Sequence, residues 1–183
     1  MWVDSKPTPY EGEPWGFDNG AFRDWKNGNV FDESAFMKRF ERAYSVGVPY
    51  MAIVPDIVGE GKRSLEFSQQ WRDRLPDWRW YLSVQDGMEI LDVASAVASG
   101  RYSGIFLGGT NGFKHTASKW SALAKRVGCS FHYGRAGTPK KVEHARSVGA
   151  DSCDSAFPIW TKERWAWFKY CFHKGHPQMS IQF

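Results

Sequence analysis

Polar residues stand at the ends of several short apolar runs in this sequence. They are Asp18, Asp56, Gln85, the Gly108–Gly109 pair, His132 with Arg135, and Asp154. A single carboxylate after a strand is often only the N-cap of the next helix. Three carboxylates with a glutamine and a glycine pair are more than capping requires. Carboxylates that face one pocket can act as a nucleophile or transfer protons, so the pattern indicates an active site at strand ends.

The elements that would position these residues alternate along the chain. Strands are predicted at 15–20, 49–56, 78–86, 103–109, 129–135 and 150–157, and helices at 32–47, 63–75, 88–100, 116–128, 138–149 and 161–173. Thr138 is a good N-cap, and Pro139 suits the first position of its helix. The strands are nearly all apolar, which is typical of strands buried on both faces. Six β/α units with short connections predict an α/β fold with a parallel sheet, in one domain over residues 1–183.

The C-terminal ends of the strands converge on one mouth in a β/α barrel, and active sites form there. The chain therefore predicts a TIM-barrel-like fold in reduced form, with only six clear strands. Residues 1–15 or the tail at 177–183 are expected to add strands. Otherwise the barrel is incomplete, or a second copy completes it as a homodimer. No dinucleotide-binding glycine motif and no P-loop is present.

Charge is unevenly distributed along the sequence. Residues 1–109 hold 12 Lys and Arg against 16 Asp and Glu, a balance of −4, whereas residues 110–183 hold 12 against 4, a balance of +8. A basic half suits a polyanion such as nucleic acid, and an ordinary solvated surface is the alternative. The three cysteines have no regular spacing, the start of the chain is polar, and no apolar run could cross a membrane. These features predict a reduced, cytoplasmic protein.

Five segments resemble, in the same order, the tRNA-guanine transglycosylases and their DNA-modifying relatives, which insert 7-deazaguanines. They are FDNGAF (17–22), VPDIVGEG (54–61), LSVQDG (82–87), GIFLGGTNG (104–112) and GTPKKVEHARSVGADSCDSAFP (137–158). The last is the best match, because the family has a Gly-Thr-Pro helix followed by Gly-Val-Asp-x-Phe-Asp-Cys and a proline. The second aspartate of that family segment is the nucleophile.

The resemblance implies a role for each strand-end residue. Asp154 would attack C1′ of a guanosine sugar and form a covalent glycosyl-enzyme, as retaining glycosidases do. Asp18 would be the general acid and base. Asp56 would accept hydrogen bonds from the guanine edge, and Gln85 with Gly109, next to Gly108, would hold the O6 side. Asn19 and Ala21 stand where the family has serine and glycine, which bears on the base that is accepted.

The chain also departs from the tRNA enzymes. It has about half their length and lacks their Cys-x-Cys-x-x-Cys zinc motif, so tRNA docking is in doubt. Zinc is a minor alternative to having no cofactor, with Cys171, His173, His176 and Cys153 as its ligands. The size favours the small DNA-directed branch that phages and bacterial genomic islands encode. The expected partners are therefore DNA and a base such as preQ0, and the location is the host cytoplasm if a phage encodes the protein.

An enzyme that exchanges a base in DNA must flip the base out or bind single strands. The candidate contacts to nucleic acid are Arg135, Lys140, Lys141, Lys162, Arg164 and Trp160, where a solvated or outer-packing helix face is the alternative. Three other functions stay open: action on tRNA, a nucleic-acid-binding barrel without catalysis, and a hydrolase that uses Asp18 and Asp154 on a small glycoside. Asp151 is expected to be structural.

Overall fold

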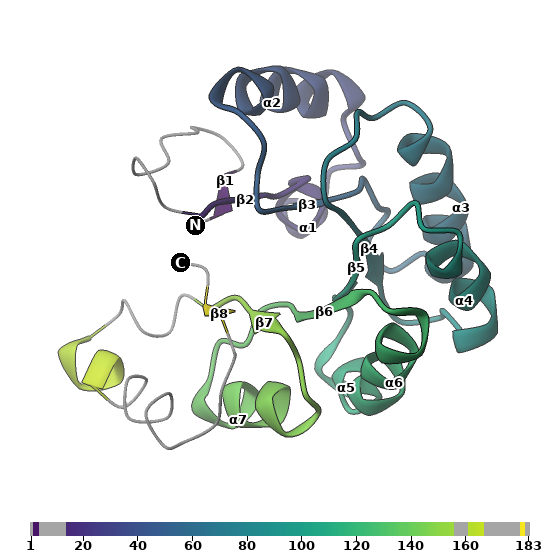
Figure 1. The fold of residues 1–183 in the computed structure, drawn as a ribbon. Helices are drawn as coiled ribbons and strands as arrows, with labels where there is room; N and C mark the ends of the chain where they lie inside the picture. Colours follow the sequence, from purple (N-terminus) through teal and green to yellow (C-terminus); the bar gives the residue numbers. More distant parts are fainter. Residues whose placement is uncertain (1, 4–13, 156–160, 167–179, 182–183) are drawn as a thin grey trace.

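The chain folds into one parallel sheet that curls with its helices on the outside (Figure 1). The computed structural model describes residues 2–3, 14–155, 161–166 and 180–181. The strands pair in chain order: β1 (Trp2–Val3), β2 (Gly16–Phe17), β3 (Met51–Ile53), β4 (Trp80–Val84), β5 (Gly104–Leu107), β6 (Ser130–Tyr133), β7 (Ser152–Cys153) and β8 (Ser180–Ile181). All seven pairings are parallel. The strands β2 to β7 form a half-barrel, which confirms the predicted fold class.

Helices follow the strands from β2 to β6 on the outside of the curl. They are α1 (Ala21–Lys26), α2 (Glu33–Val46), α3 (Gly61–Arg72), α4 (Ile90–Ala98), α5 (Asn111–Lys114), α6 (Ala117–Val127) and α7 (Pro139–Ser147). Thr138 caps α7 as predicted, because its side chain accepts a hydrogen bond from the backbone N–H of Lys141. The short helices α1 and α5 were not predicted, since four to six residues show no periodicity. None of the described helices could span a membrane.

The two edges of the sheet lie in the terminal segments of the chain. The prediction that residues 1–15 or 177–183 would add strands is confirmed, since β1 pairs with β2 and β8 pairs with β7. Among the described strands no pairing joins β1 to β8, so the sheet stays open and the barrel is incomplete. The helix predicted at 161–173 is described only at residues 162–166, which are helical.

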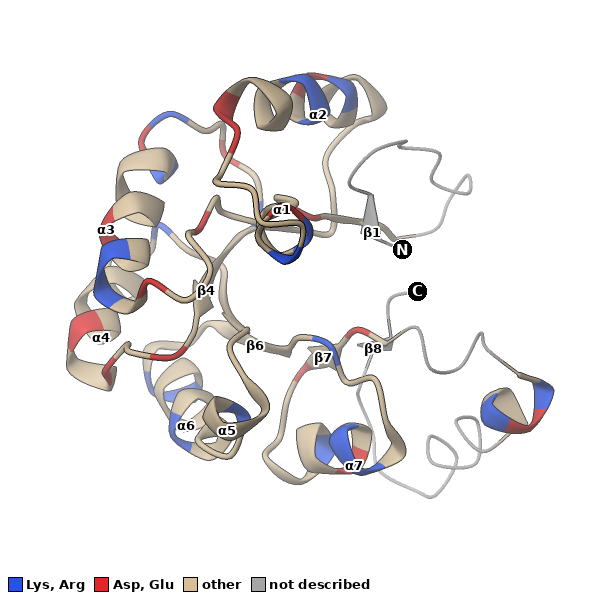
Figure 2. Cartoon of the chain, turned by 180° about the vertical axis from the view of Figure 1, so that it is seen from behind, with Lys and Arg blue, Asp and Glu red and all other residues tan. Residues whose placement is uncertain are grey.

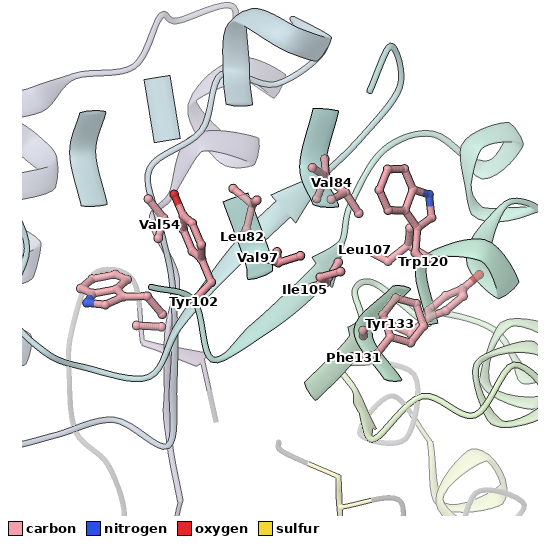
Figure 3. Close-up of a cluster of buried hydrophobic side chains, with 14 of the residues drawn as sticks. Val54, Leu82, Val84, Val97, Tyr102, Ile105, Leu107, Trp120, Phe131 and Tyr133 are labelled. Carbon is pink, nitrogen blue, oxygen red and sulfur yellow. The ribbon is translucent and has the colours of Figure 1, made fainter. Parts of the chain in front are cut away.

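The main core lies between the sheet and its helices (Figure 3). The side chains of Leu82, Ile105 and Leu107 are fully buried there and meet helix residues such as Trp120. Successive side chains of a strand point to opposite faces, so the intervening residues face the inside of the curl. A smaller apolar cluster of Met51, Ile53, Tyr81 and Phe106 lies on that inner face. The same alternation sends His132, Ser152 and Asp154 inward, because Phe131, Tyr133 and Cys153 belong to the outer core.

Close strand packing makes one glycine of β5 essential. A Cβ atom on Gly104 would lie 2.3 Å from Cε1 of the buried Tyr81 ring and 2.7 Å from the backbone oxygen of Ser130. The backbone of β6 cannot move away without breaking its pairing with β5. The side chain of residue 104 therefore has to be a hydrogen atom.

We expect Gly104→Ala to lower the free energy of unfolding by about 1–3 kcal/mol, because overpacking strains a well-filled interior. Urea denaturation followed by circular dichroism measures this loss. Gly112→Ala is the matched control: its Cβ would meet only Thr110 Oγ1, at 3.6 Å, and an exposed alanine in a helix is neutral or slightly stabilising. Equal stability of the two variants would contradict this account of the sheet.

Candidate functional site

The turn between β2 and α1 holds the first carboxylate of the site. Oδ1 of Asp18 accepts a hydrogen bond from the N–H of Gly20 at 2.7 Å, and Oδ1 of Asn19 accepts one from the N–H of Ala21 at 2.8 Å. Gly20 has a φ of 78°, and a Cβ there would lie 2.7 Å from Nη2 of Arg39. The same Nη2 donates to the backbone oxygen of Asn19. These contacts fix the direction of both side chains at the end of β2.

A buried polar network connects the ends of three strands. Asn19 donates from Nδ2 to Oδ1 of Asp56 at 2.7 Å and to the backbone oxygen of Val54 at 2.8 Å. Gln85 donates from Nε2 to Oδ2 of Asp56 at 3.3 Å and to Ser64 Oγ at 2.8 Å. The three members Asn19, Asp56 and Gln85 are only 2–6% exposed. The predicted binding residues of β2, β3 and β4 therefore form a single unit.

Asp56 is an unusually weak acid for an aspartate. Burial raises its pKa to about 6, the hydrogen bond from Asn19 opposes this rise, and the negative charge of Asp18 adds to it. Asp18 directly precedes Asn19, whose side chain bonds to Asp56, so the two carboxylates belong to neighbouring strand ends. At neutral pH most Asp56 side chains are ionised, and they gain a proton as the pH falls through about 6.

Asp154 is held at the end of β7 by residues of the neighbouring strand. Its Oδ1 accepts the backbone N–H of Arg135 at 2.9 Å and lies 3.0 Å from Nε2 of His132. The other ring nitrogen of His132 lies 2.7 Å from Oγ of Ser152, so the imidazole is fixed at both ends. Among the described residues, every hydrogen bond to the Asp154 carboxylate is made to Oδ1. The side chain of Asp154 is 18% exposed, so solvent reaches it.

Arg135 brings the separate carboxylates of the site together. Burial lowers the pKa of its guanidinium, and the negative charges of Asp154, Asp56 and Asp86 oppose this effect. Its Nη2 donates to the backbone oxygen of Gly109, and its Cζ lies 4.1 Å from the centre of the Phe22 ring. The guanidinium at the end of β6 therefore contacts the turn after β5 and the ring of Phe22 in α1.

The backbone of Arg135 is strained. Its φ is 54°, and it is the only non-glycine residue in the described part of the chain with a positive φ. Such a conformation costs about 1–3 kcal/mol, and it persists where the surroundings enforce it, often at functional sites. Here the surroundings are Asp154, whose Oδ1 accepts the N–H of Arg135 and whose backbone oxygen accepts the N–H of Ala136 at 2.7 Å.

The glycine pair after β5 makes room for the neighbouring loops. Gly109 has a φ of 71°, and a Cβ there would lie 2.8 Å from Oδ2 of Asp86 and 2.7 Å from the ring of Phe113. A Cβ on Gly108 would lie 3.2 Å from Oγ of Ser83. Both positions therefore need glycine, because a side chain there would collide with Ser83, Asp86 or Phe113.

Several residues of the site were not identified from the sequence. Asp86 accepts two hydrogen bonds from Thr110, both at 2.7 Å, and so joins the end of β4 to that of β5. Lys114 is 3% exposed, and its Nζ donates to the backbone oxygens of Leu107, at 2.9 Å, and of Gly134. Asp86 directly follows Gln85 at a strand end, so its position in the sequence could have identified it as a residue of the site. Nothing in the sequence around Lys114 distinguishes it from a surface lysine.

The predicted nucleic-acid contacts lie on outer helices, apart from Arg135. Lys140 is exposed and Lys141 half-buried on α7, while Lys162 is exposed and Arg164 half-buried in the helical segment 162–166, and both segments carry basic residues in Figure 2. Trp160 lies outside the described residues. Arg135 instead follows β6, where its backbone N–H bonds to Asp154 and its guanidinium bonds to Gly109.

The proposed zinc ligands are only partly visible. Cys171, His173 and His176 lie outside the described residues. Cys153 packs in the outer core, and burial raises the pKa of its thiol to about 12, which disfavours the thiolate that zinc binds. Over the described part of the chain, no group of three or more His, Cys, Asp or Glu side chains could hold a metal ion.

No family model, curated protein or solved structure matches this chain. The resemblance to the transglycosylases therefore depends on the residues of the chain alone. The geometry of the site is a second observation, which does not depend on that resemblance.

The charges around Asp56 predict opposite effects of two substitutions on its pKa. Asp18→Asn removes a neighbouring negative charge and is expected to lower the pKa of Asp56 below about 6. Arg135→Gln removes a positive charge and is expected to raise it. Titration of the side-chain carboxyl carbon by NMR measures both shifts. Shifts in the same direction, or none, would show that these residues do not surround Asp56 as described.

The burial of Lys114 predicts that the stability of the protein depends on pH. Burial lowers its pKa from 10.5 to about 7 in the folded protein, so between these values the unfolded chain binds more protons and stability rises with pH. We expect Lys114→Met to lose this rise and to be less stable, because two buried carbonyl oxygens lose their donor. Urea denaturation at pH 6, 8 and 10 gives the free energy of unfolding of both proteins. If the difference between wild type and variant is the same at all three pH values, the pKa of Lys114 is not lowered as described.

Proposed function

We propose that the protein is a base-exchange transglycosylase, which replaces guanine in DNA with a 7-deazaguanine such as preQ0. The observation that carries this proposal is that Asp18, Asp56 and Asp154 stand at the same ends of parallel strands, where Asn19, next to Asp18, bonds to Asp56, and where the N–H of Arg135 bonds to Asp154. A nucleophile, a proton-transferring acid and a carboxylate that can read a base edge are what base exchange requires. The resemblance of five ordered segments to the family supports the same assignment.

The first step would be an attack of the Asp154 carboxylate on C1′ of a deoxyguanosine. A bond forms between a carboxylate oxygen and C1′, the bond between C1′ and N9 breaks, and its electron pair leaves with guanine. Because His132 and the N–H of Arg135 contact Oδ1, Oδ2 is the atom we assign to the attack. The two contacts also orient the carboxylate, which lowers the entropic cost of reaching the transition state.

Asp18 would transfer the protons of the exchange. In its acid form it donates a proton to the departing guanine, and as a base it then accepts the N9 proton of the incoming base. That base attacks C1′ from the same side, the ester to Asp154 breaks, and the carboxylate is restored. The sugar keeps its configuration after two displacements, as in retaining glycosidases.

Recognition of the base would rest on the buried network around Asp56. Its ionised carboxylate can accept the N1–H and 2-amino donors of a guanine-like edge, whereas adenine would leave that carboxylate without a partner. Gln85 is committed to Asp56, Ser64 and the backbone of Gly59, so in this state it orients Asp56. The N–H of Gly109 is then the donor we assign to O6.

DNA is the polymer we favour, because residues 110–183 are basic and the sequence holds no Cys-x-Cys-x-x-Cys pattern like that of the tRNA enzymes. A guanine inside a duplex cannot reach the site, so the enzyme would flip it out or act on single strands. The exposed lysines of α7 and of segment 162–166 are suited to phosphate contacts.

Asp154→Asn is expected to reduce base exchange by about a thousandfold or more, since an amide is a poor nucleophile. The assay mixes purified protein with labelled guanine or preQ0 and, separately, single-stranded DNA, duplex DNA or tRNA. Circular dichroism and a DNA-binding measurement should be unchanged, because Asn has the same shape. Full activity in this variant would rule out the nucleophile.

Asp151→Asn is the matched control. Asp151 is three residues away and exposed, and its carboxylate accepts the N–H of Phe131 at 2.7 Å. The amide oxygen of Asn can still accept this N–H, so stability should change by about 1 kcal/mol at most while exchange continues. Label in tRNA only would redirect the proposal to the tRNA enzymes. Binding without exchange would leave a nucleic-acid-binding barrel, and release of base from a free nucleoside would indicate a hydrolase.

A further inference from the structure

The guanidinium of Arg135 lies over the ring of Phe22, bonds to the turn after β5, and feels the negative charges of Asp154, Asp56 and Asp86. Resting on the proposed function, we propose that Arg135 selects the incoming base by its 7-substituent. It favours a substituent that is anionic or accepts hydrogen bonds, such as a carboxylate, carboxamide or nitrile. It disfavours an aminomethyl group, which is a cation at neutral pH.

The position of Arg135 relative to the base follows from the chemistry of the ring. In a 7-deazaguanine, O6 and the substituent at C7 project from the same edge. Gly109 is the residue whose N–H we assign to O6, and Nη2 of Arg135 donates to the backbone oxygen of that same residue. The guanidinium therefore lies at the edge of the base that carries the 7-substituent.

The guanidinium has donors to spare for such a substituent. It has five N–H groups, and its one hydrogen bond among the described residues is the bond from Nη2 to Gly109. A carboxylate, a carboxamide oxygen or a nitrile nitrogen can accept from the others. An ammonium at the same place would instead meet the like charge of the guanidinium.

The strained backbone points to the same conclusion. A glycine at position 135 would adopt a φ of 54° without strain, so the turn alone does not call for an arginine. The Phe22 ring under the guanidinium and the carboxylates around it hold the side chain across the mouth of the site. Arginine is suited to this place, because its planar group stacks on rings and stays charged among acids.

The test compares four free bases in the DNA exchange assay: guanine, 7-cyano-, 7-carboxamido- and 7-aminomethyl-7-deazaguanine. For the wild type we expect kcat/KM of the cyano and carboxamido bases to exceed that of the aminomethyl base by about ten- to a hundredfold, the usual range for a hydrogen bond to a charged group. Arg135→Gln should bring this ratio close to one. Arg135→Lys, which keeps the charge but loses the planar fork, should retain part of it.

Lys140→Gln is the matched control, because it removes one positive charge from the exposed surface of α7. It should change all four rates by the same factor and leave the ratio unchanged. A drop in the ratio as large as that of Arg135→Gln would assign the selectivity to overall charge and overturn the inference.

Guanine separates this inference from the function on which it rests, since it carries no 7-substituent. Absence of guanine exchange in the wild type would defeat the proposed function. Normal guanine exchange with equal rates for the cyano and aminomethyl bases would overturn only the role of Arg135. If Arg135→Gln does not fold by circular dichroism, the wild-type ratio and Arg135→Lys decide the question.

Discussion

The site depends on one constraint, which is that all strands of the sheet run in the same direction and pair in chain order. In such a sheet every strand ends at the same edge, so residues far apart in sequence are brought to one mouth. Asp18 and Asp154 illustrate this. Each comes directly after the last residue of its strand, and the side chains of both point to the inside of the curl. Phe17 and Cys153, the residues before them, both belong to the outer core.

Collecting carboxylates at one mouth creates an electrostatic problem that the neighbouring side chains solve. Asp56 is buried, and without donors its ionised form would be strongly unfavourable. Asn19 and Gln85 supply hydrogen bonds, and Arg135 supplies a positive charge. The charge of Asp154 in turn favours the protonated form of the buried Lys114, which donates to the ends of β5 and β6. For Asp56, the hydrogen bond from Asn19 and the charge of Arg135 thus oppose the rise of the pKa that burial causes.

Within the site, the side chains that orient the carboxylates are buried, whereas Asp154 and Arg135 are partly exposed. His132, Ser152, Asn19 and Gln85 are almost completely buried, and their hydrogen bonds fix the direction of Asp154 and Asp56. Asp154 itself and the guanidinium of Arg135 are only partly buried. A preorganised support beside accessible polar groups is the arrangement that the proposed base exchange would need. The open edge of the barrel does not disturb it, because β2 to β7 alone supply these residues.

The sequence by itself determined the six β/α units, the parallel sheet and the polar residues at the strand ends. Apolar runs, glycine stops and the cap at Thr138 are local signals, so they can be read without the fold. Only the tertiary structure decided that Lys114 is buried, that Asn19 bonds to Asp56 and that Arg135 reaches Gly109. Those contacts join residues 20 to 37 positions apart, and they depend on how the strand ends are placed in space.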